Sequence, residues 1–384
     1  MRTFSFIPNI LMEEKRVYSN KICISTNSTC NLNCIYCYEK EKGNLEFDVD
    51  EAFNVIDEQL KIKTKLGTKI KLHGGEPFMV FDKIKELCER LWANEYPEYF
   101  HIHLTTNGTF VHGKIQEWLY ENRKKITVKL SLDGKKMSND INRPHSFEHI
   151  DIPFFVKTWP NITVNMTITP ATLPYLSENI QFMHSVGISN VVSHFALMID
   201  WGDCNLENVL YEQMLDLANY YLDNPEICPC HFFKPNIGDT LCIPLFNAAC
   251  VRGQGTAYDY QTKKYYACFM CFPALAGEKI SAELNSIDFT NTDELEEDCC
   301  LQCPFINICP TCYAENYITR GNVSYRDMAL CSYQKIIIAV LFKFEYAKLI
   351  KIEDPTSDDI RKMMAIQKWQ NEINSILSSI DDTI

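Results

Sequence analysis

The sequence predicts an α/β protein with a parallel sheet, followed by a small cysteine-rich domain and closing helices. Three observations lead to this fold class. Short apolar runs alternate with amphipathic segments over residues 21–197, cysteines gather in two separate stretches, and residues 335–377 have mostly helical spacing. Such alternation is typical of strands joined by helical crossovers, in a sheet that is open or closed into a partial barrel.

Six strands are expected in the first half of the chain. They cover residues 21–25, 69–73, 101–105, 126–132, 162–169 and 190–197. Helices are expected over residues 50–66, 82–92, 114–122, 177–186, 207–222, 335–350 and 358–377. The first helix, for example, places Ala52, Ile56 and Leu60 on one face. A polar or glycine-containing turn follows each of the first four strands, and chemistry gathers at such carboxyl ends.

The same pattern divides the chain into four parts. Residues 1–20 form an N-terminal segment, 21–235 the sheet domain, 236–334 the cysteine-rich domain and 335–384 the C-terminal helices. A proline- and cysteine-containing linker over 225–235 separates the second part from the third. Residues 250–331 show little periodicity and many cysteines, so this stretch is expected to need metal in order to fold.

Composition limits the function classes. The net charge of −13 and the lack of a long basic run argue against a nucleic-acid binder. No apolar run reaches the roughly 18 residues of a membrane span, and the N-terminus lacks the features of a signal peptide. We therefore expect a cytoplasmic protein. Its 18 cysteines then favour metal or cluster ligation, because cytosolic thiols are kept reduced.

The loop after the first strand carries Cys30, Cys34 and Cys37, spaced three and then two residues apart. Three thiolates from one short loop suit a multi-iron centre. Iron–sulfur cubes usually take four cysteines, so one iron would remain open to another ligand. A zinc site or unrelated loop cysteines are the alternatives.

With Tyr36 before the last cysteine, this loop resembles that of the radical S-adenosylmethionine (SAM) enzymes. The resemblance implies a partial (β/α)6 TIM-type barrel in which the three cysteines hold a 4Fe–4S cluster. It also implies that SAM chelates the fourth iron and is cleaved to a 5′-deoxyadenosyl radical, which abstracts a substrate hydrogen.

Three further turns resemble motifs of that family. Gly74-Gly75-Glu76 ends the second strand, where the family's GGE motif binds the SAM amine. Glycine permits close backbone approach, and a carboxylate accepts hydrogen bonds from an ammonium group. Asn107 lies in a turn similar to the family's TNG turn, at the end of the third strand.

The fourth turn, Ser131-Leu132-Asp133-Gly134, is similar to the SLDG segment. Arg143 follows Ser131 by twelve residues, and in the sulfatase-maturase-like branch a serine and an arginine at this separation contact the SAM carboxylate. A guanidinium fork suits a carboxylate. Loop capping is an equal alternative for Asp133 and Asn107, and Tyr36 either contacts adenine or is simply packed.

The second cysteine field resembles the seven-cysteine SPASM extension, which carries two auxiliary 4Fe–4S clusters. By this resemblance, Cys250, Cys268 and Cys312 would serve the first auxiliary cluster. The second would take Cys300, Cys303, Cys309 and Cys331. Two features depart from the pattern: only two residues separate Cys309 from Cys312, and the fourth ligand of the first cluster is open between Cys242, Cys271 and substrate. Zinc knuckles are the alternative.

Six cysteines fall outside these motifs. Cys23 and Cys88 lie on strand and helix patterns and are expected in the core. Cys228 and Cys230 flank a proline in a loop. They are expected to have no specific role, with redox activity or metal binding as the alternatives. Cys204 and Cys299 are unassigned.

The resemblance implies a peptide- or protein-modifying oxidoreductase, and we expect a ribosomal-peptide maturase that forms thioethers. Carbon–carbon or carbon–oxygen cross-linking and formylglycine formation in sulfatases are the alternatives. Sulfatase maturases carry a basic aspartate after the cysteine that matches Cys268, whereas this chain has Phe269. No catalytic base is assigned. A non-enzymatic iron–sulfur or zinc protein that binds a partner is the alternative from another class.

The expected partners are a peptide or protein substrate and a reductant such as flavodoxin or ferredoxin. Only 29 residues precede Cys30, too few for the leader-binding winged helix of many thioether-forming maturases. A separate leader-binding protein is therefore a further expected partner.

Overall fold

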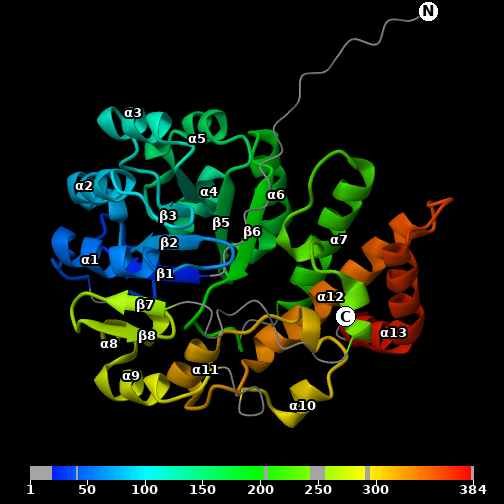
Figure 1. Cartoon of the computed structure of the whole chain (residues 1–384). Coiled ribbons are helices and arrows are strands. Elements are labelled where there is room, and N and C mark those ends of the chain that lie inside the picture. The colour runs from blue at the N-terminus through cyan, green and yellow to red at the C-terminus, as the bar shows by residue number, and fades with distance from the viewer. Residues whose placement is uncertain (1–19, 40–41, 203–205, 243–255, 290–294, 382–384) are drawn as a thin grey trace, which may run out of the picture.

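The computed structural model of the chain describes residues 20–39, 42–202, 206–242, 256–289 and 295–381 (Figure 1). Strands and helices alternate through the first half. The described strands are β1 (Asn20–Ser25), β2 (Thr68–His73), β3 (Phe100–Thr106), β4 (Ile126–Ser131), β5 (Thr163–Ile168), β6 (Asn190–Phe195), β7 (Thr256–Asp259) and β8 (Lys264–Tyr266). All six predicted strands are confirmed, with ends that differ by one or two residues.

The described α-helices are α1 (Val49–Leu60), α2 (Phe81–Trp92), α3 (Lys114–Glu121), α4 (Lys136–Asn142), α5 (Ile152–Thr158), α6 (Leu176–Ser185), α7 (Glu207–Asp223), α8 (Pro273–Ala276), α9 (Glu278–Asn285), α10 (Asp298–Leu301), α11 (Tyr313–Arg320), α12 (Met328–Leu349) and α13 (Ser357–Asp381). α4 and α5 were not predicted. α1 ends at Leu60 instead of residue 66, because Leu60 is the last buried residue before an exposed stretch.

One sheet has the strand order β6-β5-β4-β3-β2-β1-β7-β8. The first seven strands of this order pair in parallel, and β8 returns antiparallel to β7. β7 and β8 come from the cysteine-rich stretch, yet they extend the sheet beside β1 (Figure 1). Since parallel strands end at one edge, the turns after β1 to β4 lie together. The fold class is therefore confirmed as a mixed α/β, partly barrel-like parallel sheet with C-terminal helices.

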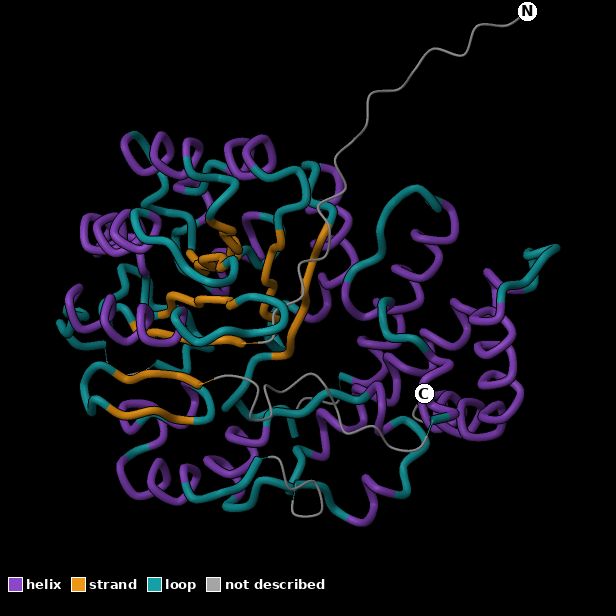
Figure 2. Tube along the Cα trace, viewed as in Figure 1, coloured by secondary structure: helices purple, strands orange, loops and turns teal. Residues whose placement is uncertain are grey.

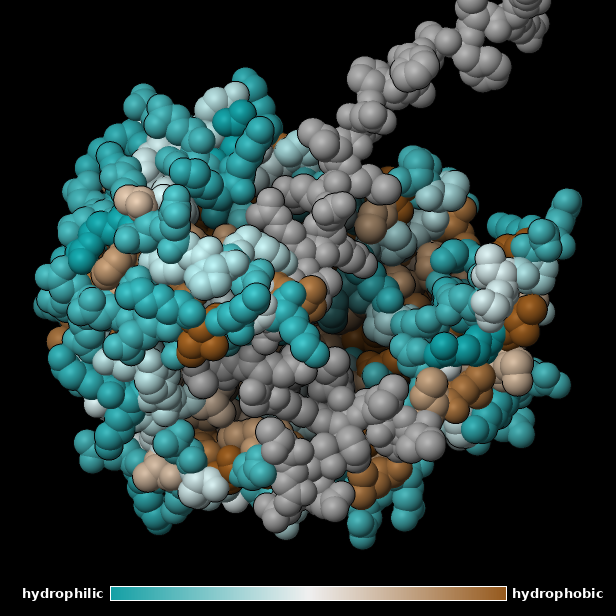
Figure 3. Space-filling view, in the orientation of Figure 1, coloured by the Kyte–Doolittle hydropathy of each residue, from teal (hydrophilic) through white to brown (hydrophobic). Residues whose placement is uncertain are grey.

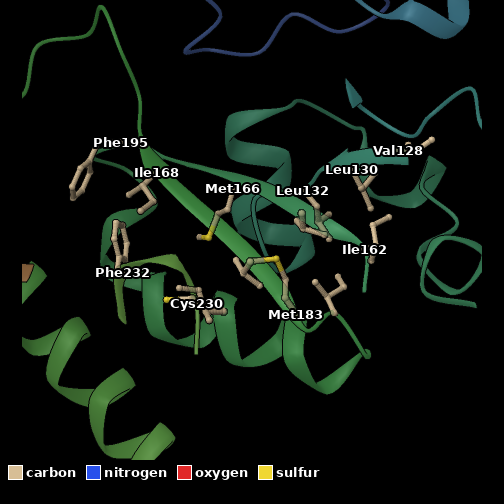
Figure 4. Close-up of a cluster of buried hydrophobic side chains, with 14 of the residues drawn as sticks. Val128, Leu130, Leu132, Ile162, Met166, Ile168, Met183, Phe195, Cys230 and Phe232 are labelled. Carbon is tan, nitrogen blue, oxygen red and sulfur yellow. The ribbon is translucent and has the colours of Figure 1, made fainter. Parts of the chain in front are cut away.

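Side chains alternate strictly across the sheet. Ile22 and Ile24 of β1, like Ile70 and Leu72 of β2, are completely buried in the core shared with the helices. Figure 4 shows the same core further along, where side chains of β4, β5, α6 and residues 230–232 meet. Cys230 is fully buried there, so it is a core residue and not an exposed loop cysteine.

The opposite side of the sheet, which we call the polar face, carries Lys21, Lys69, Lys71, His73, His101, His103 and Lys129. The lysines on this face are half-buried. Cys23 belongs to it as well, while Cys88 is fully buried on α2. The core placement predicted for Cys88 is confirmed, and Cys23 lies half-buried between sheet and cysteine-rich segment.

The C-terminal helices pack on one another, with α12 against both α7 and α13. The tube view shows them as a helical group beside the sheet unit (Figure 2). α12 begins at Met328, seven residues before the predicted start, because Asp327 caps it by accepting from the Leu330 N–H. Hydrophilic residues cover most of the described surface on the side shown in Figure 3. No described helix is both long and apolar enough to cross a membrane.

Candidate active site

The loop that carries Cys30, Cys34 and Cys37 follows β1 directly and is held by a hydrogen bond from a residue between its second and third cysteines. The N–H of Ile35 donates to the carbonyl of Asn142 at the end of α4, at 3.0 Å. All three thiols are half-buried, and burial raises the pKa of each. The pKa of each thiol is raised further by the charge of another of the three cysteines. A bound iron cluster would reverse this effect and hold the thiolate forms, so the donor set fits the predicted cluster.

The Gly74-Gly75-Glu76 turn packs directly against this cysteine loop. The N–H of Gly75 donates to the carbonyl of Asn27, and the N–H of Glu76 donates to the carbonyl of Thr29. A Cβ on Gly75 would lie 2.1 Å from the Thr29 carbonyl oxygen. The glycine is therefore required for the contact between the two loops, whatever else approaches them.

The Glu76 carboxylate joins the ends of β2 and β3. It accepts from the Thr106 hydroxyl at 2.7 Å and from the N–H groups of Asn107 at 2.7 Å and Phe78 at 3.1 Å. Burial raises its pKa to about 7. Its two oxygens offer about four acceptor sites, so one remains for a further donor. The side-chain amide of Asn107 faces the Cys30 sulfur at 4.0 Å.

Asp133 is the hub at the end of β4. Its carboxylate is fully buried and accepts from Arg143 Nε and the Tyr36 hydroxyl, each at 2.9 Å. The N–H of Thr167 on β5 also donates to it, at 2.8 Å. Asp133 thereby connects the cysteine loop, Arg143 and β5. Arg143 lies over the Tyr36 ring at 5.3 Å, and the neighbouring Ser131 is buried at the same strand end.

The second cysteine field forms two groups. Cysteines of the first group border a cavity of about 580 Å³: Cys299, Cys300, Cys303, Cys309 and Cys331. This set contains all four ligands predicted for the second auxiliary cluster and adds Cys299. Arg326 donates to the Cys309 sulfur at 3.2 Å and pairs with Glu296 at 2.6 Å.

The other group surrounds Cys268, whose sulfur lies 3.7 Å from that of Cys271. Cys312 packs into the same cluster of side chains, while Cys250 lies outside the described residues. Cys242 contacts Arg361 instead. Of the two candidates for a fourth ligand, the structure brings Cys271 next to Cys268. In the described part of the chain, no three Cys, His, Asp or Glu side chains are arranged around a single metal ion.

Residues 24–152 match the family model described as the radical SAM superfamily. The match covers the cysteine loop, the Gly-Gly-Glu turn and Arg143. The chain carries a radical SAM domain.

Curated relatives match less than half of the chain. An uncharacterised protein of Methanocaldococcus jannaschii is 32% identical over 181 residues, which are 44% of this chain and 60% of the relative. A GTP 3′,8-cyclase of Clostridium perfringens is 38% identical over 125 residues, or 31% of this chain and 37% of the cyclase. The chain thus spans between about a third and three fifths of the length of these relatives.

Two solved structures share the fold over most of the chain. Native anSMEcpe with bound AdoMet, an anaerobic sulfatase-maturing enzyme, has a TM-score of 0.63 at 18% identity, covering 86% of this chain and 98% of that one. Streptococcus suis SuiB bound to its precursor peptide SuiA has a TM-score of 0.56 at 17% identity, covering 82% and 76%. At these identities the likeness establishes the fold, and both structures are SPASM-type radical SAM enzymes.

One group of polar side chains beside the radical SAM loop belongs to none of the sequence motifs. His73 ends β2, and its Nε2 lies 3.4 Å from the Tyr38 hydroxyl and 3.7 Å from a Glu39 oxygen. The Phe269 ring covers His73, with 4.3 Å between ring centroids. Burial lowers the pKa of His73 and raises that of Glu39 to about 7. The signal was present, since His73 directly precedes Gly74.

Proposed function

We propose that the chain is a radical SAM enzyme that oxidatively modifies a ribosomally made peptide, most specifically by forming thioether cross-links. The observation that carries this proposal is the loop of three cysteines, bonded to the Gly-Gly-Glu turn within a fold shared with SAM-bound and peptide-bound enzymes. In the proposal, Cys30, Cys34 and Cys37 hold the catalytic 4Fe–4S cluster. When bound, the cluster and SAM supply a 5′-deoxyadenosyl radical that removes a hydrogen atom from substrate.

The remaining residues of the site position SAM. The free acceptor site of Glu76 receives the SAM amine, beside the backbone of Gly74 and Gly75. Ser131 and Arg143 face the SAM carboxylate, with Asp133 holding the guanidinium in orientation through its 2.9 Å bond. Tyr36 is fixed by the same carboxylate and offers its ring to adenine. Asn107 donates toward the cluster through Cys30.

The second cysteine field is proposed to hold two auxiliary clusters. When bound, they would supply an acceptor for the one electron that the substrate radical must lose after hydrogen abstraction. The first takes Cys250, Cys268, Cys312 and, as the fourth ligand, Cys271. The second takes Cys300, Cys303, Cys309 and Cys331, which already border one cavity.

The peptide substrate is inferred from the neighbours, since SuiB and anSMEcpe are both solved with peptides bound. Phe269 in place of the expected aspartate argues against formylglycine formation, because phenylalanine cannot accept a proton. We further propose that the protein is cytoplasmic. Its expected partners are a flavodoxin or ferredoxin as reductant and a separate leader-binding protein.

The test uses the full chain, reconstituted with iron and sulfide and reduced without oxygen. We expect about twelve irons per chain, four per cluster, and release of 5′-deoxyadenosine from SAM. A small peptide encoded beside the protein's own gene should lose two hydrogen atoms per cross-link, with loss of a free cysteine thiol. SAM cleavage with an unchanged peptide would reject the substrate, and a mass change that spares cysteine would redirect the chemistry to carbon–carbon or carbon–oxygen bonds.

Cys34→Ala provides the internal comparison. It should abolish 5′-deoxyadenosine release and remove about four irons, while Cys228→Ala, at an exposed loop cysteine, should leave both unchanged. Stoichiometric zinc in place of iron, or no SAM cleavage by the iron-loaded protein, would favour the non-enzymatic alternative.

A further inference from the structure

Cations gather on the polar face of the sheet in a protein whose net charge is −13. Lys21 of β1 lies directly opposite Lys69 of β2, and Lys71 follows two residues later on the same face. Lys129 of β4 lies opposite Thr105 of β3, in the next rows. Four lysines therefore share one half-buried face. Lys71 and Lys129 lie two residues before the strand ends that carry the proposed radical site, whereas Lys21 and Lys69 lie near the opposite ends of their strands.

None of these lysines makes an ion pair or hydrogen bond with a described residue. Lys71 lies 5.0 Å from the Phe269 ring centroid, and it is close enough to the Cys268 thiol to help lower its pKa. The nearby carboxylates are engaged elsewhere. Glu39 faces His73, and Asp133 is paired with Arg143. Among the described residues, no carboxylate is paired with a lysine of the polar face.

This arrangement is costly for the folded protein. Like charges directly opposite each other on neighbouring strands repel, and partial burial adds a desolvation penalty. Burial first, and then repulsion from neighbouring lysines, lowers the pKa of Lys69 to about 8 and also lowers that of Lys129. Half-buried lysines without a carboxylate partner lower the stability of the folded protein. Such unfavourable arrangements are found mainly at functional sites.

The polar face continues toward a second cavity. His194, at the end of β6, is close to Lys129 and has its ring centroid 5.8 Å from that of His231. Both histidines line a cavity of about 570 Å³ that also reaches Asn307 and Arg326. Buried polar atoms in this cavity, His231 Nδ1, Asn307 Oδ1 and Arg326 Nε, have no hydrogen-bond partner among the described residues. The cavity therefore borders the polar face at His194, the residue close to Lys129.

We propose that the polar face binds carboxylate groups of the substrate, and that the substrate is an acidic peptide segment. This inference rests on the proposed peptide-modifying function and specifies its substrate class. Lys69 and Lys71 project from one strand about 7 Å apart, the spacing at which an extended peptide presents alternate side chains. The described strands place no arginine on this face, whereas compact phosphate sites favour converging donors and guanidinium forks.

Binding can be measured apart from catalysis, on the full reconstituted chain without oxygen. The probe is a fluorescein-labelled peptide of alternating alanine and glutamate, read by fluorescence anisotropy against an alanine–glutamine peptide of equal length. We expect the acidic peptide to bind more tightly and to lose affinity as salt rises. In the K69M/K71M double variant its affinity should fall at least about tenfold, since two charge contacts are lost.

The matched control is the K61M/K114M variant, which removes the same charge from exposed lysines and should bind within twofold of wild type. A second variant, K69E/K71E, should no longer bind the acidic peptide and should bind an alanine–lysine peptide instead. Equal binding of the acidic and glutamine peptides, or unchanged affinity in K69M/K71M, would overturn the inference. Tighter binding of GTP or inorganic phosphate that K69M/K71M abolishes would also overturn it, in favour of a phosphate site.

The two proposals fail separately. If the acidic peptide binds through Lys69 and Lys71 but SAM is not cleaved, the proposed radical SAM function is rejected and the carboxylate-binding site is still supported. If SAM is cleaved and a peptide is modified without any dependence on these lysines, the function stands and the carboxylate site is wrong.

Discussion

At the scale of single residues, the buried pair of Arg326 and Glu296 supports the second cysteine group. The Glu296 side chain is completely buried and also accepts from the Tyr313 hydroxyl at 2.5 Å. Arg326→Met would remove the guanidinium that pairs with this buried carboxylate. We expect the free energy of unfolding to fall by about 3–5 kcal/mol, measured by urea denaturation of the iron-loaded chain.

Arg123→Met is the control for that substitution. Arg123 is an arginine that packs over the Tyr120 ring and donates to its carbonyl, so its loss should change the free energy by less than about 0.5 kcal/mol. Equal effects of both substitutions would show that Glu296 does not depend on Arg326. The sequence could not reveal this pair, because its members lie thirty residues apart in a stretch without periodicity.

At the scale of elements, the contact between the Gly-Gly-Glu turn and the cysteine loop decides whether the first cluster can form. Gly75→Ala would place a Cβ 2.1 Å from the Thr29 carbonyl oxygen, so the cysteine loop must shift. We expect the variant to lose about four of twelve irons and its SAM cleavage, while the auxiliary clusters keep their iron. Iron analysis and the cleavage assay on purified protein measure both.

Gly202→Ala is the matched control, since its Cβ would meet only the end of the Asp200 side chain, at 3.3 Å. It should bind iron like wild type. Full iron content and SAM cleavage in Gly75→Ala would contradict the role given to this contact.

The six parallel strands could be predicted because buried strands alternate apolar residues with period two. β7 and β8 could not, because their pairing with β1 joins segments far apart in the sequence and their own runs are only three or four residues long. Some site residues could be predicted because they belong to motifs with a recognisable spacing in the sequence, namely Cys30, Glu76 and Arg143. His73 and the lysines do not, since their meaning depends on which strands lie side by side.

At the scale of the whole molecule, an acidic protein holds a cationic interior, and this should appear in its pH dependence. Lys69 faces Lys21, Lys71 and Lys129, and burial together with these charges lowers its pKa to about 8 from 10.5. Between these values the unfolded chain binds more protons than the folded one, so this lysine makes stability rise with pH. The destabilisation caused by this lysine is complete below about pH 8 and absent above about 10.5.

Lys69→Met removes this contribution. We expect it to be more stable than wild type at pH 7.5 and the difference to shrink toward pH 10, in urea denaturation at each pH. Lys114→Met, which alters an exposed lysine paired with Asp82, should follow the wild-type curve. A difference in the free energy of unfolding between wild type and Lys69→Met that stays the same at every pH would contradict the assigned pKa.

The pairing of β1 with β7 has a consequence for how the protein is made. β1 ends at Ser25 and β7 begins at Thr256, so the ribosome must finish most of the chain before that edge of the sheet can close. At about 5–20 residues per second, the nascent chain exposes an open strand edge for roughly ten seconds or more. Exposed edges recruit other strands, so production in cells should depend on chaperones that shield the growing chain.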